Sequence, residues 1–370
     1  MPASTEPLLG DDELDRVAQC MSPASHACGY YELDLSFDYD IGRCSVWLPV
    51  PKPIAKTLPR VENYQYTVHW AKKMTALTQG WVCMPCLPSF NVKLPAGPEV
   101  VAIDPQSPPP NIGQPVAAVL MAHGLSGPRF EFCHVAEALA CRGFIVMVPE
   151  MEDSGCNRRR TVMEYGANGL GKHTVLRMHQ LHCCSLHLKS LYGEKLKFGL
   201  LGYSIGNAAV RHFRCDWPKC HIAGPSPVGK TAPVAPFVDE TAQESEASTT
   251  NAPCLLLLSH ADSLSPPPQE ASALAGHDKP IPLTIEHLLK SAWPKRGAVI
   301  HSFNSLPHPS FTHPEIVERD QSIMKKCSCL LACPDGEEVK QSRRAARLLV
   351  PLIVRFFEQS LGSGGLPKLW

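Results

Sequence analysis

Short apolar runs alternate along the chain with segments that have helical spacing. Residues 116–122, 144–149, 197–201 and 254–259 are apolar on both faces, which is typical of strands inside a parallel sheet. Residues 132–141 have helical spacing and lie between the first two runs, with Gly143 at their end. This order forms a β-α-β unit, so the pattern predicts an α/β protein with a mostly parallel central sheet flanked by helices.

The remaining patterned segments extend this sheet and its helical layers. Residues 30–50 alternate around Asp40-Ile41-Gly42, which predicts two antiparallel strands joined by a turn. Further strands are expected at 220–223 and 297–303, and helices at 175–192, 207–213, 285–292 and 342–361. Pro351 lies inside the last helix and should kink or divide it.

The chain divides into one arm and one domain. Residues 1–28 are polar and acidic and predict a flexible arm, and residues 29–370 predict a single domain without internal repeats. Residues 54–100 carry aromatic residues at mixed spacing, which indicates either a helical insertion packed on the core or a small cap lining an apolar pocket. Residues 224–253 are acidic and rich in Ser and Thr, which predicts a mobile insertion.

A nucleophile elbow is expected where the 197–201 run meets Gly202-Tyr203-Ser204-Ile205-Gly206. This G-x-S-x-G pattern places a serine hydroxyl on a strained turn between a strand and a helix. A Cβ at Gly202 or Gly206 would clash where that strand and helix pack closely. The pattern also arises in ordinary turns, but the flanking strand and helix favour the elbow. The sequence therefore predicts an α/β-hydrolase fold with a small cap insertion.

Composition limits the classes of partner. Lys plus Arg (35) equals Asp plus Glu (35), which argues against binding of nucleic acid. The N-terminus has no basic or apolar signal region, and no apolar run approaches the ~18 residues of a membrane span. Sixteen cysteines without such a signal indicate reduced thiols in a cytoplasmic protein. Arginines on helix 342–361 allow peripheral membrane contact, although packing on the sheet is the simpler interpretation.

Ester hydrolysis at the elbow requires a base, an orienting acid and donors for the oxyanion. Ser204 is the candidate nucleophile. In this fold the histidine comes last along the chain, which leaves His301, His308 and His313. His301 falls inside a predicted strand, and His308 follows that strand in a loop, so His308 is preferred.

The acid is less well specified than the base. Asp262 directly follows the 254–259 strand, where a carboxylate could reach the histidine from the rim of the sheet, although a solvated turn would look the same. Asp239 and Asp216 are the other candidates.

Two backbone amides are placed to form an oxyanion hole. Ile205 follows the nucleophile, and Leu125 lies in the His123-Gly124-Leu125 turn after the first buried strand.

No metal and no cofactor is expected for this chemistry. Cys83 and Cys86 have CxxC spacing, but a zinc site would also need ligands from a second group of cysteines, and that group has no regular spacing. That second group comprises Cys327, Cys329 and Cys333. A helix at 175–192 would carry His179, His182 and His187 on different faces, which favours packing roles.

Residues 123–153 resemble the platelet-activating factor acetylhydrolase family in its α/β-hydrolase branch. The family has the same order of a His-Gly-Leu turn, a nearby arginine (Arg129), and a Gly-Phe-Ile-Val strand that ends in Glu150 and Asp153. The elbow, the 305–311 loop and the 356–362 helix end also resemble family segments. With weaker similarity at 44–51, the match extends over most of residues 30–362.

The resemblance implies calcium-independent hydrolysis of short or oxidised sn-2 acyl chains of phospholipids. It assigns Ser204 as nucleophile, His308 as base, and the amides of Leu125 and Ile205 as the oxyanion hole. The family acid follows the strand after the elbow, but here residues 224–226 read Gly-Pro-Ser. Three hypotheses follow: a phospholipid esterase, a small-ester carboxylesterase of the dienelactone-hydrolase type, and a non-catalytic lipid-binding protein.

Overall fold

The computed structural model describes most of the predicted domain. It covers Met21 and residues 23–37, 40–69, 89–106, 114–156, 167–213, 215–223, 253–259, 281–282, 298–303, 308–326 and 336–362. Within these residues, no helix is long and apolar enough to cross a membrane.

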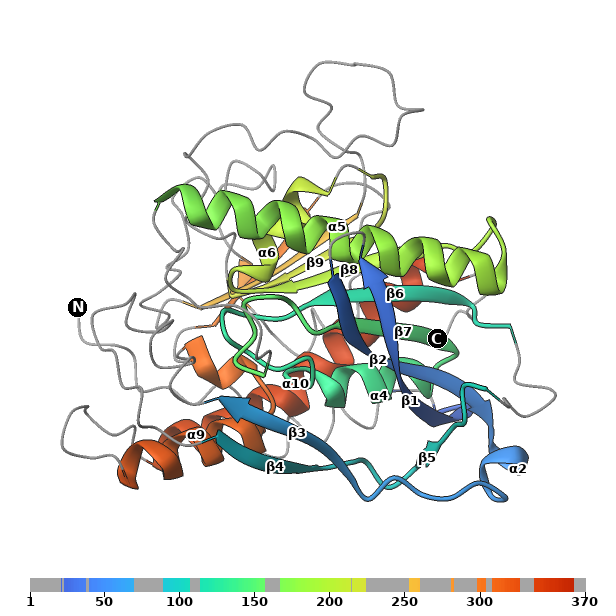
Figure 1. The fold of residues 1–370 in the computed structure, drawn as a ribbon, viewed down its shortest axis with the longest axis horizontal. Helices are drawn as coiled ribbons and strands as arrows, with labels where there is room; N and C mark the ends of the chain where they lie inside the picture. Colours follow the sequence, from blue (N-terminus) through green and yellow to red (C-terminus); the bar gives the residue numbers. More distant parts are fainter. Residues whose placement is uncertain are drawn as a thin grey trace, which may run out of the picture.

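The described strands form one large sheet and one hairpin. The sheet contains β1 (His26–Phe37), β2 (Asp40–Pro51), β5 (Val100–Ala102), β6 (Ala117–Ala122), β7 (Phe144–Pro149), β8 (Phe198–Tyr203), β9 (Lys219–Ile222), β10 (Cys254–Ser259), β11 (Ile281–Pro282) and β12 (Ala298–Phe303). Their order is β11-β12-β10-β9-β8-β6-β7-β2-β1-β5 (Figure 1). The central strands pair in parallel, and the antiparallel β1–β2 hairpin joins them at β7. A mostly parallel sheet with helices on both faces confirms the predicted fold class.

Both faces of the central strands are buried, which explains their uninterrupted apolar sequences. Along β6, successive residues enter two hydrophobic clusters alternately, with Val119 in one and Leu120 in the other. One face is covered by α4 (Cys133–Ala140) and α10 (Gly336–Leu361), and the other by α5 (Ala167–Tyr192) and α6 (Gly206–His212), as Figure 1 shows.

Several element boundaries differ from the prediction. β1 begins at His26, so the last three residues of the predicted arm belong to the sheet. α10 begins at Gly336 and continues through Pro351, so the expected division of this helix is wrong. Two helical segments were not predicted, η3 (His308–Phe311) and α9 (Pro314–Lys326). The predicted helix at 285–292 and almost all of the predicted insertion at 224–253 lie outside the described residues.

The described part of the predicted cap is a β-hairpin and not a helical insertion. β3 (Asn63–His69) and β4 (Ser89–Pro95) pair in an antiparallel two-stranded sheet, and the short α2 (Lys52–Ala55) precedes them. Buried Tyr64 and Tyr66 pack on Phe130, at ring distances of 5.2 and 5.1 Å. These two rings therefore belong to the hydrophobic core. The rest of the predicted cap, residues 70–88, is outside the described residues.

Hydrogen bonds hold this hairpin to the sheet and to α4. The Trp47 indole N–H donates to the Tyr64 hydroxyl at 2.9 Å, and that hydroxyl donates to the Glu137 carboxylate at 2.7 Å. The Gly97 N–H donates to the same carboxylate oxygen at 3.2 Å. Burial raises the pKa of the Glu137 carboxyl, which these donors oppose. The network thus satisfies polar groups that the aromatic core would otherwise leave unpaired.

The described cysteines are all free thiols. Burial raises the pKa of the Cys28, Cys133 and Cys220 thiols well above the ordinary value.

Candidate active site

Ser204 lies on a sharp turn between β8 and α6. Its φ is +52°, in the left-handed region that residues with a side chain rarely adopt. The Ser204 N–H donates to the Ile222 carbonyl at 3.2 Å, and the Ser204 carbonyl accepts from the Asn207 N–H at 3.0 Å. This turn has the backbone geometry of a nucleophile elbow.

The two glycines of the elbow fill positions where no Cβ fits. A Cβ on Gly206 would lie 2.2 Å from the Ala122 carbonyl oxygen, and one on Gly202 would lie 2.9 Å from the Asn207 Cα. These contacts are with backbone atoms, which cannot move aside as a flexible side chain can. The elbow is therefore pressed both against its own helix and against the end of β6.

Backbone strain is concentrated at the carboxyl ends of the central strands, which form one edge of the sheet. Three described non-glycine residues have positive φ: Ser126 (57°), Ser204 (52°) and Ala223 (56°). They follow the carboxyl ends of three adjacent strands, β6, β8 and β9. Left-handed non-glycine residues typically cluster at active sites, where the surrounding structure holds them in place. Their positions mark this edge as the candidate active site.

The two predicted oxyanion donors lie at this edge. Leu125 follows β6, and Ile205 is the N-cap residue of α6. Among the described residues, neither amide N–H donates a hydrogen bond to another protein group. Gly124 and the elbow are in close contact, because a Cβ on Gly124 would lie 2.8 Å from the Tyr203 ring. Within the described residues, both amide N–H groups therefore remain without an acceptor.

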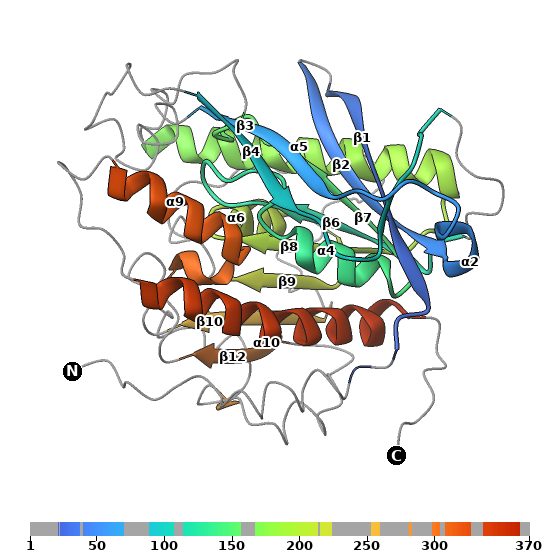
Figure 2. The same ribbon diagram turned by 90° about the horizontal axis from the view of Figure 1, so that it is seen from below.

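Residues 308–313, which come after β12 in the chain, lie at the same end of the sheet. The His313 N–H donates to the Glu131 carbonyl at 3.0 Å, and the Glu131 carboxylate accepts from the Gly124 N–H at 2.7 Å. Figure 2 shows η3, the short orange helix that His308 opens, beyond the carboxyl ends of β8 and β9. The backbone of His308 therefore lies on the side of the sheet where a base for Ser204 is needed; its side chain is outside the described residues.

The other two histidines considered from the sequence have different surroundings. His301 lies within β12, as expected. The His313 Nδ1 accepts a hydrogen bond from the Glu315 N–H at 3.3 Å, so this nitrogen does not carry the proton that an orienting carboxylate would accept. Burial lowers the pKa of His313 to about 4.

The orienting acid remains a prediction. Asp262 and Asp239 lie outside the described residues. Asp216 is exposed and precedes β9, so it lies at the amino end of that strand, across the sheet from Ser204. Ala223 follows β9, and residues 224–226, where the family resemblance implies a carboxylate, lie outside the described residues.

Two arginines are buried close to this end of the sheet, and only one of them was noted in the sequence. Arg129 donates to Glu150 at 2.6 Å and to Ser45 at 2.8 Å, and also contacts Glu32. Burial alone would lower the pKa of Arg129, but Glu150 and Glu32 outweigh it and raise that pKa.

Arg177 was not predicted, although its place in the helical pattern of α5 points to a buried position. It lies one turn before Leu181 and shares an apolar stripe with Cys184 and Leu188, so a charged residue occupies a core position of α5.

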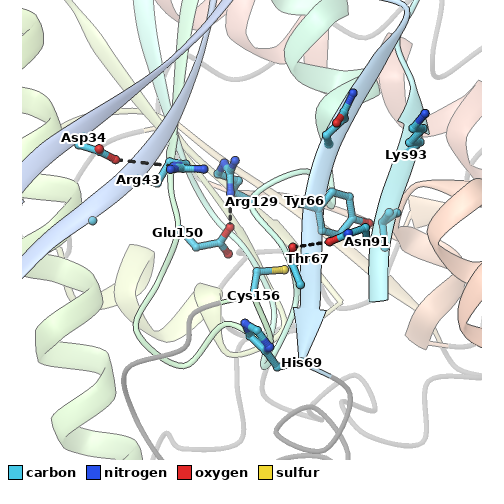
Figure 3. Close-up of a pocket in the computed structure, with 13 residues that line it drawn as sticks. Asp34, Arg43, Tyr66, Thr67, His69, Asn91, Lys93, Arg129, Glu150 and Cys156 are labelled. Carbon is cyan, nitrogen blue, oxygen red and sulfur yellow. Dashed lines mark hydrogen bonds and ion pairs between the residues drawn. The ribbon is translucent and has the colours of Figure 1, made fainter. Parts of the chain in front are cut away.

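A separate cleft of about 1130 Å³ opens between the β1–β2 and β3–β4 hairpins (Figure 3). Its lining includes the charged or polar side chains of Arg43, Lys93, His69 and the Arg129–Glu150 pair. Ser204 does not line it, so this cleft is distinct from the elbow.

The metal sites considered from the sequence find no support in the described residues. No group of three or more His, Cys, Asp or Glu side chains there is arranged to hold a metal ion. On α5, the His179 ring and the Cys183 thiol are 3.5 Å apart, a contact within one helix turn. Cys83, Cys86 and the late cysteines at 327–333 lie outside the described residues.

No protein-family model and no curated protein matches this chain. Among solved structures, a ferulic acid esterase from Streptomyces cinnamoneus is 16% identical with a TM-score of 0.46, covering 94% of this chain and 95% of its own. A dienelactone hydrolase from Anabaena variabilis is 11% identical with a TM-score of 0.43, covering 91% and 100%. An esterase from an Arctic intertidal metagenomic library is 12% identical with a TM-score of 0.38, covering 75% and 83%. At these values, the function must be argued from this chain's own elbow and loops.

Proposed function

We propose that this chain is a serine ester hydrolase with Ser204 as its nucleophile. The observation that carries the proposal is the left-handed Ser204 between β8 and α6, with the unused amides of Leu125 and Ile205 beside it. His308 takes the proton from the Ser204 hydroxyl as the oxygen attacks the ester carbonyl. The two amides stabilise the oxyanion, and water then hydrolyses the acyl-enzyme.

Asp262 is proposed as the residue that orients His308. It follows β10, the second strand beyond the elbow strand β8 in the sheet. Residues 224–226, the family position for the acid, read Gly-Pro-Ser and contain no carboxylate.

A fluorophosphonate probe tests the proposal directly. The wild type should be labelled and should hydrolyse short-chain esters, and Ser204→Ala should lose both properties while remaining folded. Asp262→Asn should lower turnover by about 10⁴-fold, the effect of replacing the orienting carboxylate in a serine hydrolase. Asp216→Asn is the matched control, because this aspartate lies at the amino end of β9, away from Ser204. Equal labelling of wild type and Ser204→Ala would eliminate the proposal.

The proposed substrates are short or oxidised sn-2 acyl esters of phospholipids, on the basis of the resemblance in residues 123–153. A small soluble ester of the dienelactone type is the second candidate, favoured by an acid after β10. A substrate panel separates them: turnover confined to soluble esters would favour the second candidate.

A lipid-binding protein without catalytic activity is the remaining alternative. It is favoured by the absence of a carboxylate at residues 224–226. Saturable binding of phospholipid vesicles, together with no labelling of the wild type, would support this alternative.

A further inference from the structure

We infer that Arg177 is a positioning residue that aims the Leu125 N–H at the oxyanion of the proposed reaction. This inference rests on the proposed ester hydrolysis at Ser204. It concerns a residue of α5 that lies outside the elbow and outside the loop it would position.

Arg177 is one of the most deeply buried charged side chains described. It forms a two-point ion pair with Asp153, with Nε 3.1 Å from Oδ1 and Nη2 2.5 Å from Oδ2, and both side chains are 1% exposed. Burial opposes ionisation of Asp153, but Arg177 outweighs it and holds the pKa of that carboxyl below its ordinary value. Asp153 is therefore ionised at neutral pH, and the two-point pairing holds the guanidinium in one orientation.

The remaining donors of this guanidinium are used on the backbone of the oxyanion loop. Nη1 donates to the His123 carbonyl at 2.5 Å, and Nη2 donates to the Gly124 carbonyl at 3.2 Å. A planar guanidinium with five N–H donors suits this task, since an ammonium group has no such fixed geometry.

Two further donors hold the same Gly124 carbonyl, namely the Gly127 N–H at 3.2 Å and the His123 ring. The Met151 N–H donates to His123 Nε2 at 3.0 Å, so the ring proton lies on Nδ1, which donates to the Gly124 carbonyl at 2.8 Å. Burial and the nearby Arg177 lower the pKa of His123, which keeps the ring neutral and keeps this arrangement intact. On the other side, Glu131 accepts from the Gly124 N–H.

The Gly124 carbonyl and the Leu125 N–H belong to the same planar peptide, so contacts that fix one also fix the direction of the other. The described residues contain no cis peptide bond, and in a trans peptide the C=O and N–H point in opposite directions. Holding the Gly124 carbonyl toward Arg177 and His123 therefore turns the Leu125 N–H away from them. Donors on the carbonyl also polarise the peptide and strengthen its N–H as a hydrogen-bond donor.

Arg177→Lys tests the inference, because it keeps the charge and loses the planar fork. A misdirected oxyanion donor should lower kcat by about 10²-fold with KM unchanged, the loss typical of one donor. Affinity for an aryl trifluoromethyl ketone should fall in parallel. In that adduct the Ser204 oxygen bonds to the carbonyl carbon, the carbonyl oxygen becomes an alkoxide, and the proton passes to His308.

Arg129→Lys is the matched control. Arg129 is also buried and paired with carboxylates, but it makes no hydrogen bond to residues 123–125. It should lose stability as Arg177→Lys does and keep its kcat. Asp153→Asn provides a second variant in case Arg177→Lys does not fold; its amide oxygen still accepts from Arg177, so a smaller drop in kcat is expected.

The outcomes separate the two proposals. A wild type without labelling or turnover would overturn both the proposed function and this inference. An active wild type whose folded Arg177→Lys or Asp153→Asn variant keeps its kcat would overturn the inference alone. An equal loss of kcat in Arg129→Lys would also overturn it, since the effect would then be general to buried ion pairs.

Discussion

At the scale of single residues, the elbow depends on two positions that have no Cβ. In Gly206→Ala the new methyl group would lie 2.2 Å from the Ala122 carbonyl oxygen, so either β6 or α6 must shift. We expect a loss of about 1–3 kcal/mol in the free energy of unfolding and a loss of ester turnover. Urea denaturation and steady-state kinetics measure the two effects.

Gly193→Ala serves as the control for this substitution. Gly193 has a φ of +91° and no atom within 4 Å of its added Cβ, so only backbone strain opposes the change. It should lose stability by about 1–2 kcal/mol and keep its turnover. A Gly206→Ala variant with wild-type stability and turnover would show that the elbow is looser than described.

The residues of the candidate site differ in how far the sequence could predict them. Ser204, Gly202 and Gly206 lie in one local motif, so five consecutive residues were enough to place them. Arg177 and Asp153 meet across 24 positions of the chain, and no local pattern pairs an arginine on a helix with a loop carboxylate. Contacts of this kind depend on packing across the sheet, which a single sequence does not encode in its spacing.

At the scale of elements, the strands were easier to predict than the connections. β6, β7 and β10 match the apolar runs within one residue, because burial on both faces leaves little room for polar residues. β3 has strict alternation of buried and more exposed positions, but its aromatic residues were interpreted as a helical insertion or cap. α9 was missed because its sequence has few apolar residues; it begins at Pro314, a residue suited to a first helical turn.

The Tyr64 hydroxyl links the β3–β4 hairpin to the sheet and to α4. Tyr64→Phe would leave the Trp47 indole N–H and the Glu137 carboxylate without a shared partner. We expect a loss of about 1–3 kcal/mol, the typical effect of leaving a buried polar group unpaired, measured by thermal or urea unfolding. In the matched control, Tyr31→Phe, the hydroxyl makes no hydrogen bond within the described residues, so its loss should be much smaller. Equal losses in both variants would contradict the role of the network.

At the scale of the whole molecule, buried histidines should make the fold sensitive to acid. Burial lowers the pKa of His221 to about 3 and of His313 to about 4, and it also lowers those of His123 and His134. In the unfolded chain these groups titrate near 6.5. Between about pH 6.5 and 4 the unfolded state therefore binds protons that the folded state does not, and the free energy of unfolding falls as the pH falls.

Urea titrations at pH 8, 6, 5 and 4 measure this dependence. Above pH 6.5 both states are neutral at these histidines, so they contribute no slope there. Asp153 acts in a different window, because its lowered pKa affects stability only near and below its ordinary value of 3.8. Stability that stays constant from pH 6.5 to 4 would contradict the expectation.

The buried thiols offer a way to follow the loss of structure. Cys28, Cys133, Cys184 and Cys220 are fully buried, and a thiol reacts as its thiolate. An alkylating reagent can therefore modify them only when the surrounding layer separates. Because Cys133 lies on α4 and Cys184 on α5, the order in which mass spectrometry finds them alkylated would report which side of the sheet opens first.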